Sequence, residues 1–175
     1  MKKYIAASAL ALGVLSANPA LAQSSANATA PGSTTIVQPV TVTQTADLVF
    51  GRVVRPSSGS DTISITNASD AVTATGGTAF PIATTGVTTS RAKFTVAGEG
   101  AQTVSVTVPS TFSMTGTGTA IVVTLSGDKT GSQALGGTLG TASSIVVNVG
   151  GSFALASTQA TGAYSGSFTV SAAYN

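Results

Sequence analysis

The side chains that most often perform catalysis or bind metals are scarce in this chain. It contains no histidine and no cysteine, so the usual general base, the usual zinc ligands and the thiol nucleophile are all missing. The acidic residues are dispersed along the sequence: Asp47, Asp61, Asp70, Glu99 and Asp128. Neither Asp61 nor Asp70 has the acidic neighbours at alternate positions that a calcium loop requires. We therefore expect no enzyme, no cofactor and no metal site.

The N-terminal residues form an export signal. Lys2 and Lys3 precede a short apolar run over residues 4–15, and Ala20-Leu21-Ala22 supplies the small-x-small pattern that signal peptidase recognises. A membrane-spanning helix needs about 20 apolar residues, and this run is shorter. We expect residues 1–22 to be cleaved. The mature protein is then exported to the periplasm, the cell surface or the extracellular space, without insertion into a membrane.

The charge of the mature chain gives no sign of nucleic-acid binding. Without Lys2 and Lys3, five basic residues of the seven remain, and they equal the five acidic residues in number. Two pairs, Arg52 with Arg55 and Arg91 with Lys93, have strand spacing and are typical of solvated sheet faces. Nucleic-acid binding needs a concentrated basic footprint, which is absent. We expect no nucleic-acid partner.

The elements that position these side chains are strands. Apolar residues make up 42% of the chain and alternate with Thr and Ser over short segments, while no segment after the signal has a helical period. Many short strands at regular spacing predict an all-β fold, a single antiparallel immunoglobulin-like β-sandwich over residues 39–175. Strands are predicted at residues 40–43, 48–54, 62–66, 71–75, 79–84, 91–97, 102–108, 119–126, 144–149 and 152–155.

Two glycine-containing segments predict hairpin turns. Residues 91–97 and 102–108 flank Gly98-Glu99-Gly100, which predicts a hairpin. Gly150-Gly151 is a two-residue turn suited to a tight hairpin between the strands on either side of it. A loop is predicted to begin at Gly127-Asp128 and to extend to about residue 140.

The last fourteen residues, 162–175, form the most regular strand pattern. Gly166 and the larger residues Tyr164, Phe168, Val170 and Tyr174 fall on one side, together with Ala172, and mostly hydroxyl side chains fall on the other. A period of two marks a strand with one buried face and one wet face. Because the predicted sheet ends on this strand, the strand has an edge that something must cover.

A polar leader, residues 23–38, precedes the predicted sandwich. It contains Pro31-Gly32 and many small residues, which is typical of a flexible segment. It also holds an alternation that could form a strand. The candidate donor residues in it are Ala26, Ala28, Ala30, Ile36 and Val37.

Several segments together resemble a family of secreted β-sandwich proteins catalogued as domain of unknown function 4402. Its relatives are spore coat protein U and the archaic chaperone–usher fimbrial subunits. The matching segments are residues 48–51, 91–98, 149–155 and 162–175. The last of these also resembles the end of a pilin, with a glycine fourteenth from the end and an aromatic residue at the penultimate position. Gly162 and Tyr174 occupy these two places.

The resemblance implies a mode of assembly. Such pilins lack one strand. In the Gram-negative cell a periplasmic chaperone fills the resulting groove until the subunit reaches an outer-membrane usher. The leader of the next subunit then replaces the chaperone by strand addition, or donor-strand complementation. The resemblance therefore implies a structural subunit of a surface fimbria, with other copies or related subunits as partners. The acceptor edge would contain Gly162, Tyr164, Phe168, Val170 and Tyr174.

An alternative remains open from the residues alone. Many chaperone–usher subunits carry a disulfide near the first strand and bulky donor residues, whereas this chain has no cysteine and its leader alternates alanines. A self-complete, monomeric exported sandwich, acting as an adhesin or surface-coat protein, also fits. In that version the segment at residues 36–42 pairs with the chain's own sheet.

Overall fold

The fold is described here by a computed structural model, which covers residues 26–82 and 86–175. The chain divides into two units, Met1–Thr35 and Ile36–Asn175. The predicted signal peptide, residues 1–22, lies outside the described residues. In the first unit, residues 26–35 are exposed and have no regular secondary structure.

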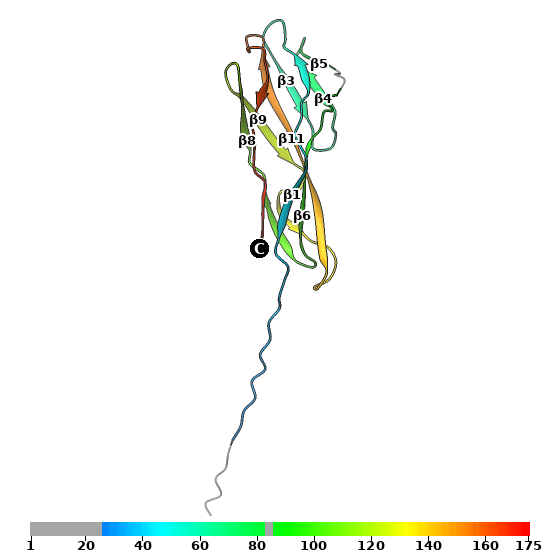
Figure 1. Ribbon diagram of the computed structural model, residues 1–175, viewed down its shortest axis with the longest axis vertical. Coiled ribbons are helices and arrows are strands. Elements are labelled where there is room, and N and C mark those ends of the chain that lie inside the picture. Colours follow the sequence, from blue (N-terminus) through cyan, green and yellow to red (C-terminus); the bar gives the residue numbers. More distant parts are fainter. Residues whose placement is uncertain (1–25, 83–85) are drawn as a thin grey trace, which may run out of the picture. The chain divides into compact units, whose positions relative to one another are not determined.

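The second unit contains thirteen strands, and residues 26–82 and 86–175 contain no helix. The strands are β1 Thr41–Ala46, β2 Arg52–Val54, β3 Ser60–Ile65, β4 Val72–Thr75, β5 Phe80–Ile82, β6 Ala92–Glu99, β7 Thr103–Thr107, β8 Thr111–Gly116, β9 Ile121–Gly127, β10 Gly131–Ala134, β11 Ala142–Ala156, β12 Tyr164–Ser165 and β13 Ser171–Tyr174 (Figure 1). All of the pairings between these strands are antiparallel. The prediction of an all-β antiparallel sandwich is confirmed.

Two main sheets form the sandwich. The larger has eight strands, in the order β1-β6-β11-β9-β8-β12, with β3 paired to β11 and β4 paired to β3. The smaller has the order β10-β7-β13, and a separate two-stranded sheet pairs β2 with β5. Strand β9 lies between β11 and β8, so the predicted central strand around it is confirmed.

Strands β7 and β8 follow one another in the chain but belong to different sheets. Strand β7 is followed after Pro109 by β8, and both pair with the end of the chain, β8 with β12 and β7 with β13. On their other side β8 pairs with β9 and β7 with β10. Proline has no N–H to donate, so it is placed where a ladder is interrupted. The chain thus passes from β7 in the smaller sheet to β8 in the larger one, and later from β12 in the larger sheet to β13 in the smaller one.

Strand β11 is the longest strand and joins three others. Its first half, from Ala142 to Val149, pairs with β6, and its second half pairs with β3 and with β9 (Figure 1). The predicted hairpin at Gly150-Gly151 is therefore wrong, because the strand runs through both glycines. A Cβ at Gly150 would lie 2.6 Å from the backbone nitrogen of Asn67, so this glycine permits a close approach of two backbones.

The first predicted hairpin is also wrong. Strand β6 pairs with β1 and β11, whereas β7 pairs with β10 and β13, so the chain crosses from one sheet to the other between them. The donors at the crossing bond to a distant loop. Gly100 N–H donates to Thr141 O at 2.8 Å, and Ala101 N–H donates to Leu135 O at 3.0 Å. Ala101 has a positive φ of 56°, which completes the sharp turn.

Four smaller differences separate the predicted strands from those of the structure. The loop expected after Gly127 contains β10, and the strand expected over residues 48–54 is reduced to the Val49–Ser90 bridge and β2. Strand β8 was not predicted, although Phe112 and Met114 alternate in it. The predicted strand at residues 79–84 is represented by β5, and its last two residues lie outside the described ones.

The core lies between the sheets and is mainly aliphatic. Each fully buried Val or Ile contributes about 1.5–3 kcal/mol relative to an exposed one. Side chains no more than 2% exposed include Ile63, Ile65, Val96, Val104, Val106, Val123, Leu135, Val147 and Val149. Because the chain has no cysteine, this packing and the ladders hold the sandwich together.

Candidate assembly groove

The end of the chain and the segment after β1 form two sides of an open groove. Strand β12 pairs with β8 on one edge, and β13 pairs with β7. In the part of the chain that the structure describes, no strand pairs with the other edge of β12 or β13. The groove is lined on one side by residues 48–55 and on the other by residues 159–164, which lead into β12. We call it the assembly groove.

The assembly groove has a volume of about 930 Å³ and a mainly apolar lining. Side chains of the core, Phe153 and Leu155 among them, form part of its surface, and the exposed Ile82 and Val87 also line it. The full lining is residues 48–55, Ile82, Val87, Met114, Ile121, Phe153, Leu155 and residues 159–164. The groove therefore borders the core of the sandwich, although Phe153 and Leu155 themselves are only 7% and 8% exposed.

Two hydrogen bonds join the first segment of the sandwich to the last. The Arg55 Nη1 donates to Gln159 O at 2.8 Å, and the Tyr174 hydroxyl donates to Gln38 O at 2.7 Å. Among the described residues, no backbone pairing joins residues 48–55 to β12 between these two contacts. The Arg55–Gln159 contact thus bridges the assembly groove, whereas the Tyr174–Gln38 contact lies outside the residues that line it.

Of the predicted acceptor residues, Gly162 and Tyr164 line the groove, whereas Phe168, Val170 and Tyr174 lie further along the terminal segment. The expected single strand is divided into β12 and β13, because residues 166–170 form no ladder, but the alternation of burial continues through them. Val170 is 6% exposed, whereas its neighbour Thr169 is exposed. The predicted faces of this segment therefore match the structure.

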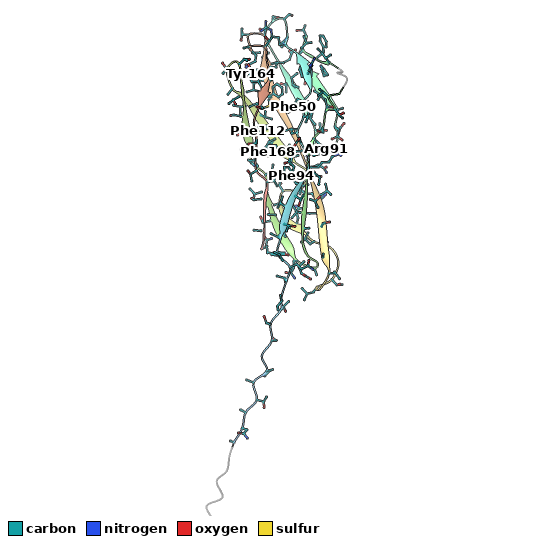
Figure 2. All side chains as sticks on the ribbon, viewed as in Figure 1. Phe50, Arg91, Phe94, Phe112, Tyr164 and Phe168 are labelled. Carbon is teal, nitrogen blue, oxygen red and sulfur yellow. The ribbon has the colours of Figure 1, made fainter. Side chains whose placement is uncertain are left out.

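Phe168 packs into an aromatic cluster with rings from two other strands. Its ring centroid lies 5.9 Å from that of Phe94 on β6 and 5.2 Å from that of Phe112 on β8 (Figure 2). Aromatic pairs at this distance contribute about 0.5–1.5 kcal/mol beyond their burial. The cluster fixes the middle of the terminal segment, where backbone pairing is absent.

Tyr164 lies in the lining of the assembly groove, near its Arg55 end. Its hydroxyl donates to Ala160 O at 2.9 Å and accepts a hydrogen bond from Gln159 Nε2 at 2.8 Å. Gly162 precedes it with a φ of 147°, a conformation that favours glycine, and a Cβ there would contact the Thr117 side chain. Gly162 therefore allows the chain to turn into β12.

The predicted donor residues fall in both units. Ala26, Ala28 and Ala30 belong to the first unit, where they are exposed and outside any strand. Ile36 and Val37 begin the second unit and are 87% and 40% exposed. An exposed isoleucine next to an exposed valine is apolar surface that assembly could cover.

The charged side chains around the fold are paired structurally. Arg91 N–H donates to Asp70 Oδ1 at 3.0 Å, and this backbone hydrogen bond, followed by the Lys93 side chain, holds the pKa of the Asp70 carboxyl below its ordinary value despite partial desolvation. Asp61 is 4% exposed and accepts the N–H groups of Thr78 and Ala79. These carboxylates fix turns.

Within 26–82 and 86–175, no group of three or more His, Cys, Asp or Glu side chains could hold a metal ion. The same part of the chain contains no helix that is long and apolar enough to cross a membrane.

Two features of the site were not found from the sequence. Arg55 was assigned to a solvated face, yet its side chain bridges the groove. Glu99 was assigned to a turn, yet it belongs to β6 and is 2% exposed. The alternation of buried and less buried residues in β6 continues to Gly98, and following it to that residue predicts a strand that includes residues 98 and 99. The burial of Glu99 depends on partners far away in the chain.

The fold and the groove define a β-sandwich with an open strand edge beside an apolar groove. Comparison with protein-family models matches residues 40–174 to the family described as Domain of unknown function (DUF4402). The match covers most of the chain, and the chain therefore belongs to this family. No curated protein and no solved structure matched the chain.

Proposed function

We propose that this protein is an exported structural subunit of a surface fimbria or a related secreted assembly, polymerising by donor-strand complementation. The leader of one copy would add as a strand to the groove of the next copy. This head-to-tail contact does not close on itself, so repetition gives a filament. A periplasmic chaperone and an outer-membrane usher would be partners in assembly, and no catalytic activity is required.

The observation that carries this proposal is the assembly groove. A strand placed between residues 48–55 and β12 would pair with the free edge and contact the apolar lining of the groove. Unpaired strand edges attract another strand because their N–H and C=O groups lack partners. The leader has a suitable length, since its twelve described residues, 26–37, span about 40 Å when extended.

The uncharged leader also suits the groove chemically. Residues 26–37 carry no charged side chain, so no charge would be buried in the apolar lining. Burial of Ile36 and Val37 in the assembled state would remove the exposed apolar surface that precedes β1.

A second candidate function is a self-complete exported monomer that acts as an adhesin or coat protein. It is favoured by the small side chains Ala26, Ala28 and Ala30, because alanine methyl groups would fill a groove of about 930 Å³ incompletely. In this version the groove would stay open or accept a ligand.

Deletion of residues 25–37 from the mature protein tests the proposal. The purified protein is analysed by size-exclusion chromatography and by gel electrophoresis with and without heating in detergent. The full mature chain should give heat-labile ladders, and the deleted chain should give only soluble monomer. Polymers that persist after the deletion would exclude the leader as donor, and a monomeric full chain would favour the second candidate.

A matched pair of point variants separates donor action from a general effect of apolar surface. Ile36 and Val122 are both exposed, at 87% and 58%, and Val122 lies on β9. Ile36→Ser should weaken the polymer, whereas Val122→Ser should leave it unchanged. Equal effects of the two substitutions would indicate non-specific association.

A further inference from the structure

The chain is held firmly at the residue where the leader meets the sandwich. The Gln38 N–H donates to Glu99 Oε2 at 3.2 Å, and the Gln38 carbonyl accepts from the Tyr174 hydroxyl at 2.7 Å. The same hydroxyl accepts a hydrogen bond from the Glu99 N–H at 2.6 Å. Both the N–H and the carbonyl of Gln38 are therefore hydrogen-bonded, one to Glu99 and the other to Tyr174, and Glu99 and Tyr174 are also hydrogen-bonded to each other. We call these three residues the exit clamp.

The exit clamp is built into the packing of the domain. Glu99 is 2% exposed, and its second carboxylate oxygen accepts the Gly140 N–H. A Cβ at Gly98 would lie 2.5 Å from the Tyr174 hydroxyl oxygen and 3.1 Å from Leu135 Cδ1, so only glycine leaves space for the tyrosine side chain. These contacts hold the Glu99 carboxylate and the Tyr174 hydroxyl in place independently of Gln38.

Length alone does not decide which groove the leader enters. The leader could span about 40 Å, and Gln38 is connected to the groove lining by β1, which is only six residues long. A leader that folded back beside its own β1 would reach the lining. Such a fold needs a tight reversal of the chain between the leader and Thr41.

The reversal is opposed by the residues at which it would occur. Pro39 has a fixed φ and no N–H, so it cannot close a hairpin by donating a hydrogen bond. Rotation at Gln38 would break its bonds to Glu99 and Tyr174, and it would leave the buried Glu99 carboxylate with one partner fewer. Loss of a hydrogen bond to a buried charged group is more costly than loss at an exposed one.

We propose that the exit clamp stops the leader from filling the groove of its own chain, so that the occupant of the assembly groove is a second copy. The inference rests on the proposed function, since it states how that groove is kept free for another subunit. Tyr174 thereby serves both ends of the contact: it ends the acceptor strand and directs the donor of the same chain outwards.

The absence of cysteine makes a direct test possible. Ala28→Cys in the leader and Ala160→Cys in the groove lining introduce the only two thiols. Under mild oxidation of the full mature protein, a disulfide within one chain leaves a monomer on a non-reducing denaturing gel, whereas a disulfide between chains gives covalent oligomers. A mixture of two singly substituted chains reports contacts between chains alone.

The expected result is a change of partner when the clamp is removed. With the clamp intact, disulfides between chains should predominate. Tyr174→Phe removes the hydroxyl that binds Gln38, and the ratio of intrachain to interchain disulfide should rise about tenfold, as loss of a hydrogen bond of ordinary strength predicts. Gly98→Ala should act in the same direction by displacing the tyrosine.

Ser132→Ala is the matched control. It removes the 2.9 Å hydrogen bond between Ser132 Oγ and Asn175 Nδ2, beside Tyr174 but without contact to Gln38, and the disulfide ratio should not change. If Tyr174→Phe and Gly98→Ala both give the ratio of this control, the clamp proposal is wrong while the proposed function stands. If the singly substituted chains never crosslink, the proposed function fails. If, in addition, the doubly substituted chain with an intact exit clamp forms the intrachain disulfide, the clamp proposal fails as well.

Discussion

Substitution of Phe168 by alanine should destabilise the sandwich strongly, although this residue lies in a segment without backbone pairing. Its ring contacts Phe94 and Phe112, and it is half-buried. Truncation of a fully buried phenylalanine costs about 3–5 kcal/mol, and the partial exposure lowers this figure to about 2–3 kcal/mol. The loss includes the two aromatic contacts as well as the transferred area.

The assay is urea unfolding of the mature protein, measured on the monomer fraction. With a dependence of unfolding free energy on urea of about 2 kcal/mol per molar, the loss corresponds to a midpoint lower by about 1 M. Phe80→Ala is the control, because Phe80 is 54% exposed on β5, and its change should stay within about 0.5 kcal/mol. Equal midpoints for the two variants would refute the claim that the aromatic cluster anchors the terminal segment.

Three further predictions concern residues outside the groove. Asp70→Asn should destabilise the protein at pH 7, and the difference from the wild type should shrink as the pH falls below about 3.9, because the lowered pKa of Asp70 contributes stability only while the folded carboxylate stays ionised; a difference independent of pH in thermal unfolding would contradict this. Gly150→Ala should cost several kcal/mol, since the new methyl group would meet the backbone at Asn67, and chemical denaturation would show a change below 1 kcal/mol if that approach were tolerant. Asp61→Ala should cost about 1–3 kcal/mol by leaving the N–H groups of Thr78 and Ala79 without their acceptor, and unchanged hydrogen exchange at these two amides would disprove the assigned role.

The sequence predicted the parts of the fold that depend on local alternation. The buried and exposed faces of residues 162–175 match the structure, because a period of two constrains every side chain of a strand. Glycine pairs were less informative. Gly150-Gly151 is compatible with a tight turn and with a close approach of two backbones, and only the position of Asn67 on another strand separates these readings.

Contacts between distant residues account for what the sequence could not predict. The pairing of β6 with β11 rather than β7 depends on residues that are far apart in the chain. The burial of Glu99 depends on Gln38, Gly140 and Tyr174, none of which is a neighbour in sequence. The assembly groove is formed in the same way, because its two sides are the beginning and the end of the domain.

The position of β11 has a consequence for how the domain folds. Residues 142–156 pair with β6, β3 and β9, all of which precede them in the chain, so each of these strands lacks a neighbour until its part of β11 has been made. Sheets dominated by such long-range pairing fold slowly, and their unpaired edges invite aggregation meanwhile. A newly made chain should therefore begin to fold with β3, β6 and β9 each lacking a neighbour. A protein that binds those free edges would then raise the yield of folded protein more than a local stabilisation would.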